Sequence, residues 1–336
     1  MYLPSRHSMK KILIIQTAFI GDVILATALI EKLYHFYPGI ELDFLLRKGN
    51  ESLLKDHPML GQILVWNKQT SKHQNLFKIW RQVRKNNYDV VVNLQRFLSS
   101  GLLTAFSGAS MTLGFDKNPL GRFFTRSFKH EISSDKNSPH EVSRNLKLIE
   151  SLTNDKFVGP KLYPSLQDFA KVRCKEDYIT ISPTSVWFTK QWPAEKWVAL
   201  INTVPSRIKV FLLGAPSDKA ACDKIAMDTN HASVKVRAGE LSLLQSAALM
   251  KGAVMNYVND SAPLHLASSM NAPVTAVFLS TVPAFGFTPL SDEHKVVETA
   301  LSLECRPCGL HGKAACPLGH FKCAEIELSF EQHRII

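Results

Sequence analysis

Several features that would mark a special class of protein are missing from this sequence of 336 residues. It has no run of about 18 or more consecutive apolar residues, so no membrane-spanning segment is expected. Glycine and proline are not enriched, with 16 and 17 residues, which excludes collagen-like and low-complexity chains. With 45% hydrophobic and 21% charged residues, the chain can bury sizeable cores, and its length favours two domains.

The first residues have basic side chains before an apolar run, but the run is too short for a secretory signal. Their apolar run ends after Ile15 at a Gln-Thr pair, which suits a buried strand better than a signal sequence. We therefore expect a cytoplasmic protein that touches a membrane at most from its surface.

Acidic residues are under-represented in the first half of the chain. Residues 1–165 carry 23 Lys and Arg against 13 Asp and Glu, a net charge of +10, whereas residues 166–336 carry 17 against 16, a net charge of +1. The first half is therefore predicted to attract anions. A solvated basic surface without a partner would give the same count, and nucleic acid, acidic lipid and phosphorylated glycans would all fit it.

Short apolar runs alternate with helical patterns, which is typical of βαβ units around parallel sheets. The predicted strands are residues 12–15, 40–46, 63–65, 90–94, 178–182, 209–213, 253–258 and 274–279. One helix is predicted directly after the first strand. The other clear helices are residues 76–85, 194–202, 217–228, 242–250 and 263–270. A polar stretch with Pro160 and Pro164 separates the two sets.

The pattern predicts an α/β protein with two Rossmann-like domains, residues 1–165 and 166–318, whose parallel sheets face each other across a cleft. Ligands are then expected at the carboxyl ends of the strands. The remaining segment, residues 319–336, is expected to return toward the N-terminal domain.

The turn after the first strand lacks the glycine pattern of a dinucleotide-binding site. Of G-x-G-x-x-G only Gly21 is present, which argues against a nicotinamide or flavin enzyme. Asp22 falls in the first turn of the next helix. It is either a carboxylate that stabilises the helix terminus or a general base in the cleft, and its position alone fits both interpretations.

Hydroxyl groups and a lysine follow the strand at residues 178–182. Thr184, Ser185 and Lys190 are groups that can hold phosphate oxygens, although Lys190 would also suit a solvated loop. Trp187 and Trp192 are interpreted as packing residues.

A second candidate anion site follows the strand at residues 253–258. Asp260 precedes a predicted helix start with Ser261 as N-cap and Pro263 in the first turn. The free amides of such a helix end attract anions. His265 by itself indicates a buried histidine more often than a catalyst.

Cysteine is rare, with 6 residues, but four of them lie within a stretch of 19. Four thiols can close a tetrahedral zinc site, with His311 or His320 as substitute ligands. The second pair lacks C-x₂-C spacing, so reduced thiols that order a loop are favoured over zinc, and disulfides are not expected in a reducing cytoplasm. The four are Cys305, Cys308, Cys316 and Cys323.

Four motifs together resemble one known family. They are IGDV at 20–23, TKQWP at 189–193, GAPSD at 214–218 and NDSAPLHLA at 259–267, accompanied by GFDKN at 114–118 and HEVSRNLKLI at 140–149. In this order, over nearly the whole chain, they resemble the bacterial lipopolysaccharide heptosyltransferases of glycosyltransferase family 9. The resemblance implies a GT-B fold, an ADP-heptose donor on the C-terminal domain and an anionic inner-core acceptor on the N-terminal domain, at the inner membrane surface.

The resemblance also implies roles for individual residues. Asp22 matches the family's general base and Lys190 its phosphate-binding lysine. Arg122 and Arg126, in the basic GRFFTR stretch, are expected to contact the acceptor. A glycine is common in the family at position 262, where a methyl group would narrow the donor pocket. The expected donor-binding residues are Thr184, Ser185, Lys190, Asp218, Glu240, Leu241, Asp260, Ser261, Ala262 and His265.

We therefore expect an inverting glycosyltransferase that needs neither metal nor cofactor. Asp22 would take the proton of the acceptor hydroxyl while Lys190 stabilises the departing ADP. The sequence near these residues has no Asp-x-Asp pair, which argues against magnesium dependence. A nucleotide-sugar epimerase of the same architecture is the alternative among enzymes. A basic nucleic-acid or zinc-dependent binding protein is the alternative outside them, but nucleic acid is not expected as a partner because no stacking aromatic platform accompanies the basic residues.

Overall fold

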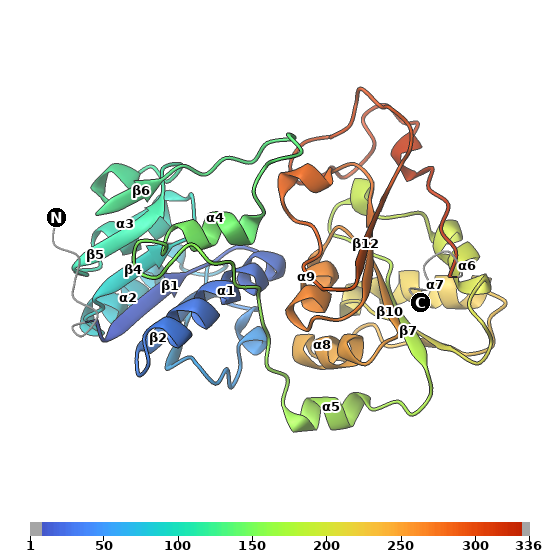
Figure 1. Cartoon of the computed structure of the whole chain (residues 1–336), viewed down its shortest axis with the longest axis horizontal. Coiled ribbons are helices and arrows are strands. Elements are labelled where there is room, and N and C mark those ends of the chain that lie inside the picture. The colour runs from blue at the N-terminus through green and yellow to red at the C-terminus, as the bar shows by residue number, and fades with distance from the viewer. Residues whose placement is uncertain (1–8, 331–336) are drawn as a thin grey trace. The chain divides into compact units, whose positions relative to one another are not determined.

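A computed structural model describes residues 9–330, which form two α/β units. The first comprises the chain up to Ile132 and Pro139–Tyr163, and the second comprises Ser133–Ser138 and the chain from Pro164 onward. The main division falls in the polar stretch around Pro160 and Pro164. Each unit contains one six-stranded sheet (Figure 1). The predicted α/β class with two Rossmann-like parallel sheets is confirmed.

The first unit has the strand order β3-β2-β1-β4-β5-β6, with all strands parallel. This is the order of dinucleotide-binding folds, in which the chain changes its direction of travel between the first and fourth strands. The elements are β1 (Lys11–Ile15), α1 (Ile20–Phe36), β2 (Glu41–Arg47), β3 (Gln62–Trp66), α2 (Lys72–Lys85), β4 (Val90–Asn93), α3 (Leu98–Ala105), β5 (Met111–Phe115), β6 (Arg126–Phe128) and α4 (Glu141–Lys147).

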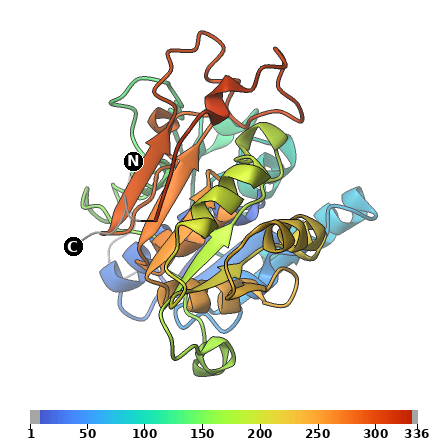
Figure 2. The same cartoon turned by 90° about the vertical axis from the view of Figure 1, so that its right-hand side faces the viewer.

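The second unit repeats this order. Its sheet reads β12-β11-β10-β7-β8-β9, again parallel throughout, and Figure 2 shows it toward the viewer. The change of direction lies between β7 and β10. The elements are α5 (Leu166–Val172), β7 (Tyr178–Ser182), α6 (Ala194–Asn202), β8 (Lys209–Leu212), α7 (Lys219–Asp228), β9 (Val234–Val236), α8 (Leu243–Lys251), β10 (Met255–Asn259), α9 (Ala262–Ser269), β11 (Val274–Phe278) and β12 (His294–Glu298).

Burial explains which strands the sequence revealed. Every residue of β4, β7 and β10 is buried, because helices cover both faces of a parallel sheet, and such strands read as continuous apolar runs. The edge strands β6, β9 and β12 are partly exposed. Their short, polar sequences gave no such signal, so the pattern missed all three. Two strands depart from this rule, because the partly exposed edge strand β3 was found and the buried strand β5 was missed. The helices α3, α4 and α5 were missed as well.

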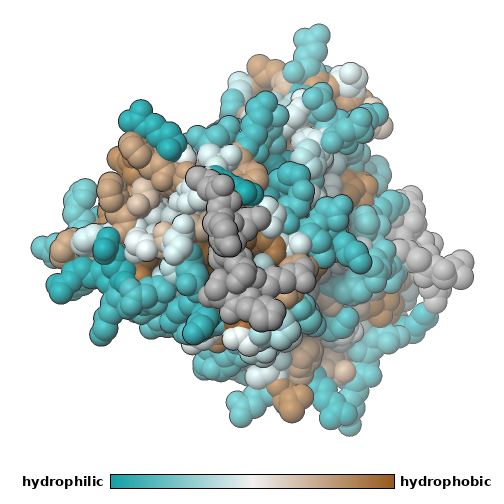
Figure 3. Space-filling model, turned by 60° about the vertical axis from the view of Figure 1, so that its left-hand side comes forward, coloured by the Kyte–Doolittle hydropathy of each residue, from teal (hydrophilic) through white to brown (hydrophobic). Residues whose placement is uncertain are grey.

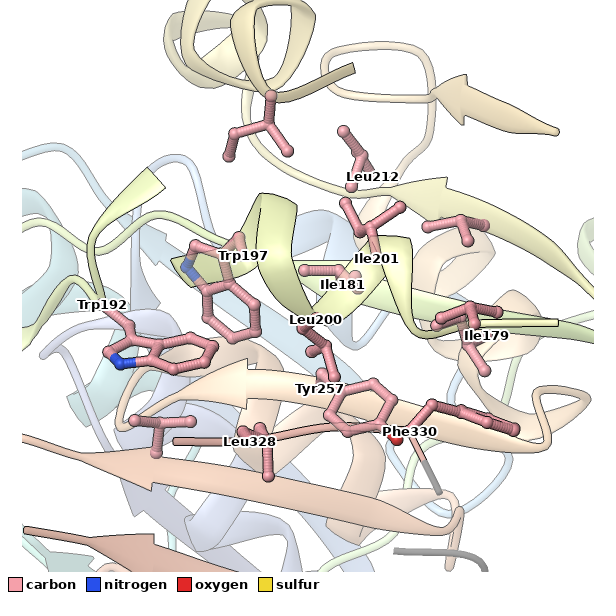
Figure 4. Packing of buried hydrophobic residues seen from close by; sticks show 14 of the residues in the cluster. Ile179, Ile181, Trp192, Trp197, Leu200, Ile201, Leu212, Tyr257, Leu328 and Phe330 are labelled. Atoms are coloured by element: carbon pink, nitrogen blue, oxygen red, sulfur yellow. The ribbon is translucent and has the colours of Figure 1, made fainter. Parts of the chain in front are cut away.

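A large apolar cluster forms the core of the second unit (Figure 4). Trp192 and Trp197 meet edge to face in it, with ring centres 4.8 Å apart. The interpretation of Trp192 as a packing residue is confirmed. Trp187, by contrast, is 38% exposed and lies at the surface.

The C-terminal segment completes this same core. Ile326, Leu328 and Phe330 are buried in the cluster, and Figure 4 shows Leu328 and Phe330 near Tyr257 of β10. The expected return of residues 319–336 toward the N-terminal domain is therefore wrong for the part described, because its apolar side chains are buried in the second unit. Residues 331–336 lie outside the described residues.

Hydrophilic residues prevail on the face drawn in Figure 3, with separate apolar areas between them. Among residues 9–330 there is no helix that combines the length and apolar character needed to cross a membrane. Separate exposed apolar side chains such as those in Figure 3 are normal on a folded protein.

The packing of the C-terminal segment predicts a stability effect. Leu328 is 6% exposed, so Leu328→Ala should destabilise the second unit by about 2–5 kcal/mol, the usual effect of truncating a buried leucine. Leu318 is 63% exposed in the same segment, and Leu318→Ala should change stability by less than about 0.5 kcal/mol. Urea unfolding followed by tryptophan fluorescence measures both. Equally small effects would show that the segment adds nothing to the core.

Candidate active site

The expected catalytic and donor-binding residues follow the carboxyl ends of neighbouring strands in the two sheets. In each sheet the chain reverses its direction of travel beside the first strand of the unit, between β1 and β4 and between β7 and β10. Loops that leave such a point run to opposite faces of the sheet and open a crevice between them, where α/β proteins bind ligands.

Asp22 lies in the first turn of α1, directly after β1. Its Oδ2 accepts a hydrogen bond of 3.2 Å from the backbone N–H of Phe19, the N-cap residue. The carboxylate therefore does stabilise the helix terminus. Burial raises the pKa of Asp22 from 3.8 to about 6, and the negative charge of Glu141 adds to the rise. A carboxyl group in this range can exchange a proton near neutral pH.

A buried ionic cluster at the start of α4 supplies that negative charge. Glu141 accepts a hydrogen bond of 2.7 Å from Arg144 Nε and lies 3.2 Å from His130 Nε2. Burial raises the pKa of Glu141, but the hydrogen bonds and charges of His130 and Arg144 outweigh burial and hold that pKa below its ordinary value. Glu141 therefore stays ionised and opposes ionisation of Asp22. The motif at 140–149 contains Glu141 but did not reveal this role, because the pairing with His130 is tertiary.

Two further basic residues that the sequence did not single out lie at this edge of the first sheet. Lys68 follows β3 and donates to the carbonyl and hydroxyl oxygens of Thr17 at 3.1 and 2.8 Å. Burial, helped by the charges of Arg47 and Lys72, lowers the pKa of Lys68 to about 8. Arg47 ends β2 and lies over the exposed ring of Phe19, 4.6 Å from its centre. The charge excess of the first half was their only sequence signal.

Arg122 and Arg126 lie at different positions along the strand direction of the first sheet. Arg122 is exposed in the 3₁₀ turn Gly121–Phe123 after β5, with its guanidinium 4.8 Å from the centre of the Phe123 ring. Arg126 opens the edge strand β6 and pairs with Leu113 in the middle of β5. Of the two, only Arg122 lies in a loop that follows the carboxyl end of a strand.

Lys190 and Asp260, from different loops of the second unit, form a partly buried ion pair. Lys190 ends the 3₁₀ turn Phe188–Lys190 after β7, Asp260 follows β10, and Nζ and Oδ2 are 2.8 Å apart. The same carboxylate oxygen accepts the hydroxyl of Thr281 at 2.6 Å. The two charged side chains are 14% and 9% exposed. Lys190 is therefore held in place, and the solvated-lysine interpretation is wrong.

The loop after β7 is tied to the end of β10. Asn259 donates its amide to the carbonyl oxygen of Pro183 at 2.9 Å, and Gln191 donates to the carbonyl oxygen of Ser185 at 2.6 Å. Thr184 and Ser185 are half-buried between these bonds. The hydroxyl groups of Thr184 and Ser185 therefore lie in the loop after β7, which also carries Lys190 of the ion pair.

Helix α9 begins as predicted, with Ser261 at the N-cap and a proline in the first turn. Ala262 is its first residue and is half-buried. His265 is buried and meets the ring of Phe287 edge to face at 6.4 Å. This ring contact shows that His265 is a packing residue. The contact by itself indicates no further role.

Asp218 lies in the 3₁₀ turn Pro216–Asp218 after β8 and closes the GAPSD loop. Its Oδ2 accepts a hydrogen bond of 2.8 Å from the backbone N–H of Ala215. A side chain at Gly214 would place a Cβ 2.7 Å from the Cβ of Asp218, so this position requires glycine. The motif therefore has a local structural reason besides any part in binding.

Glu240 and Leu241 lie beside this loop. The backbone N–H of Gly239 donates to the carbonyl oxygen of Gly214 at 2.9 Å, which joins the chain after β9 to the chain after β8. Glu240 is exposed and accepts from Arg237 Nε at 2.7 Å, while Leu241 is half-buried. The predicted donor-binding residues thus follow four adjacent strands, β10-β7-β8-β9, at one edge of the sheet.

The C-terminal cysteines are free, and their environments differ. Cys305 Sγ lies 3.9 Å from His320 Nε2, and Cys308 donates to the carbonyl oxygen of Cys305 at 3.3 Å. Backbone N–H groups, that of Phe321 above all, lower the pKa of Cys316, whereas burial raises the pKa of Cys323 to about 11. Within residues 9–330, no three side chains of His, Cys, Asp or Glu are arranged to hold a metal ion.

The strand order of both sheets and the polar loops at their direction changes define a Rossmann-type α/β protein with two units. The family model of glycosyltransferase family 9 (heptosyltransferase) matches residues 76–317. Lipopolysaccharide heptosyltransferase 3 of Escherichia coli (strain K12) is 28% identical over 282 residues, which cover 79% of this chain and 81% of the relative. The chain therefore belongs to glycosyltransferase family 9, and the resemblance seen in the motifs is confirmed.

Solved structures agree on the fold. The Escherichia coli ADP-heptose lipopolysaccharide heptosyltransferase II is similar with a TM-score of 0.76 and 20% identity, over 89% of this chain and 95% of that one. Escherichia coli heptosyltransferase WaaC, solved with ADP, is similar with a TM-score of 0.70 and 21% identity, over 85% and 92%. The expected GT-B class is confirmed. The chain is thus a glycosyltransferase, and the epimerase and nucleic-acid alternatives lose their support.

The raised pKa of Asp22 predicts a stability effect that depends on pH. Between pH 3.8 and about 6 the folded state holds this proton more tightly than the unfolded state. Stability therefore falls as the pH rises through that window and stays lower above it. Asp22→Asn removes the charge and should stabilise the protein by about 1–3 kcal/mol at pH 8, with the gain shrinking toward pH 4.

Urea unfolding at pH 8 and pH 4.5 measures this difference. Asp223→Asn is the matched control, since Asp223 is an exposed carboxylate paired with Lys219, and it should give no gain at either pH. A gain for Asp22→Asn that is equal at both pH values would show that the native state does not disfavour the ionised carboxylate.

Proposed function

We propose that this glycosyltransferase transfers a heptose from ADP-heptose to an anionic inner-core acceptor of lipopolysaccharide, with inversion at the anomeric carbon. The observation that carries the proposal is the held Lys190 ammonium between the loops after β7 and β10, 2.8 Å from Asp260. A positioned cation at this point suits the diphosphate of a nucleotide-sugar. The heptosyltransferase activity of the relatives and the ADP in the WaaC structure support this choice of donor.

The second unit would bind the donor. Lys190 has three N–H donors, so it can keep its bond to Asp260 and still meet a phosphate oxygen. The amides and dipole at the start of α9 add positive potential beside it. The nucleoside would lie toward β8 and β9. The proposed donor contacts are Thr184, Ser185, Lys190, Asp218, Glu240, Leu241, Asp260, Ser261, Ala262 and His265.

The first unit would supply the base. With its pKa raised to about 6, Asp22 is mostly ionised at neutral pH and still basic enough to accept a proton. It takes the proton of the acceptor hydroxyl, whose oxygen attacks the anomeric carbon opposite the ADP. The bond from that carbon to the phosphate oxygen breaks, and ADP leaves with the electron pair. Lys190 and the α9 amides stabilise the developing negative charge, so the proposed reaction needs neither metal nor cofactor.

The first unit would also bind the acceptor. Its net charge of +10 suits phosphorylated and carboxylated sugars. Arg122 and Arg126 are the proposed contacts, joined by Arg47, whose charge reaches Asp22. Because such an acceptor is anchored in lipid, we propose that the enzyme works in the cytoplasm, peripherally at the inner membrane surface.

The base predicts a specific loss of turnover. Wild-type enzyme given ADP-heptose and a truncated core acceptor should yield a product heavier by one heptose residue, seen by mass spectrometry. Asp22→Asn should lower kcat by about 10²-fold or more and leave ADP affinity nearly unchanged. In the wild type, kcat/KM should fall as the pH drops below about 6, because Asp22 becomes protonated. A variant that turns over normally would reduce Asp22 to a helix cap.

The basic half predicts a salt effect that differs between the two substrates. Exposed cations are screened over about 8–10 Å at physiological salt, whereas the donor contacts are short and partly enclosed. Raising the ionic strength should therefore raise the acceptor KM more than the donor KM, and Arg122→Glu should do the same at low salt. Lys171→Glu, at an exposed position of the second unit, is the control. Equal increases for both substrates would contradict the assignment of the acceptor surface.

A further inference from the structure

The segment Arg306–Lys313 contacts the loop after β7, which carries Lys190, and the chain after β11, whose Thr281 bonds to Asp260. We call Arg306–Lys313 the clamp. Arg306 Nε donates to the carbonyl oxygen of Leu279 at 2.6 Å, and Nη2 donates to the carbonyl oxygen of Thr281 at 2.9 Å and to Glu298 Oε2 at 2.6 Å. The arginine side chain is only 11% exposed. It therefore fixes the backbone on both sides of Ser280, just after β11.

This first arm of the clamp leads to Asp260. The backbone that Arg306 holds carries the Thr281 hydroxyl, which donates to Asp260 Oδ2 at 2.6 Å. That oxygen is also the partner of Lys190 Nζ. Thr281 is 1% exposed, so the surrounding atoms restrict the rotation of its side chain. A shift of the chain after β11 would therefore move the carboxylate that holds Lys190.

The second arm reaches the residue next to Lys190. The Thr189 hydroxyl accepts from the backbone N–H of Lys313 at 2.8 Å and from the Ser280 hydroxyl at 2.9 Å. The Thr189 N–H donates to the carbonyl oxygen of Lys313 at 3.1 Å. The Cys308 N–H donates to the carbonyl oxygen of Ser280 at 2.8 Å. Thr189 is 1% exposed, so these bonds are shielded from water.

The clamp also touches the Lys190 side chain itself. Gly312 has a φ of +78°, and a Cβ at this position would lie 2.9 Å from Lys190 Cγ. Glycine is thus required here both by the backbone conformation and by the close approach. Through this contact and the two arms, the clamp is connected to both members of the ion pair, to Lys190 directly and to Asp260 through Thr281.

We propose that the clamp positions Lys190 and Asp260 for the donor diphosphate, with Arg306 and Thr189 as positioning residues. The inference rests on the proposed function, because it assigns the clamp to donor binding. A lysine side chain has many rotamers, and an ammonium oriented in advance needs no reorganisation when the phosphate charge arrives.

Calorimetric titration with ADP tests the proposal. Arg306→Gln and Thr189→Val should each weaken ADP binding by about 10-fold, since each loses buried hydrogen bonds to the loops. Thr189→Ser keeps the hydroxyl and should stay close to wild type. Arg306→Lys keeps the charge but not the planar fork, so it should resemble Arg306→Gln. In turnover the donor KM should rise with the ADP dissociation constant while the acceptor KM stays unchanged.

Lys196→Gln is the matched control for general loosening of the C-terminal segment. Lys196 pairs with Glu327, which ties this segment to α6 away from the clamp, so ADP affinity should not change. If Thr189→Val fails to fold, Gly312→Ala replaces it, because its methyl group pushes against Lys190 and should also weaken ADP binding.

Lys190→Ala separates a failure of the clamp from a failure of the proposed function. If wild type binds ADP and Lys190→Ala weakens binding, but Arg306→Gln and Thr189→Val or its substitute bind like wild type, the clamp proposal is wrong and the donor assignment stands. If Lys190→Ala also binds ADP like wild type, or wild type does not bind ADP at all, the donor assignment fails and the clamp loses its role with it.

Discussion

The partly buried ion pair between Lys190 and Asp260 is the interaction on which the candidate site of the second unit depends. Removing an ammonium and a carboxylate from water costs several kcal/mol for each ion unless both are paired and hydrogen-bonded. Three strand ends meet this requirement together: β7 leads to the lysine, β10 to the aspartate and β11 to the Thr281 hydroxyl that completes the carboxylate. A parallel sheet makes the arrangement possible because its carboxyl ends lie along one edge. The pair therefore holds a stabilised positive charge at the strand ends where the donor phosphate is proposed to bind.

The first unit uses the same strand order for the opposite electrostatic purpose. Burial raises the pKa of its Asp22 carboxyl group, the ionised Glu141 raises it further, and the charge of Arg47 offsets only part of this rise. In the second unit Lys190 and Asp260 compensate each other's charge, whereas in the first unit the charge of Asp22 is only partly compensated. In the proposed reaction the base must accept a proton and the phosphate-binding lysine must stay charged, so the two units apply the same electrostatic principles in opposite directions.

The sequence revealed those parts of the fold whose signals are local. The central strands β1, β4, β7 and β10 were predicted because burial on both faces makes them continuous apolar runs. The edge strands β6, β9 and β12 were missed because partial exposure weakens that signal, whereas the longer apolar run of the edge strand β3 was still recognisable. The C-terminal segment was misplaced for a related reason: its spaced apolar residues show that it packs against something, but not against which core. Leu328 could equally have covered the first sheet until its neighbours were known.

The site divides in the same way. Asp22, Lys190, Asp260 and the start of α9 could be found in the sequence because each stands at a fixed offset after a recognisable strand. Their surroundings could not. Glu141 acts on Asp22 from a helix more than a hundred residues away in the chain, and Arg306 is connected to Lys190 through Thr281 and Asp260. A strand and the loop after it are written in consecutive residues and appear as a pattern. Which charge or hydroxyl faces that loop is decided when distant segments pack, and packing leaves no periodic trace in the chain.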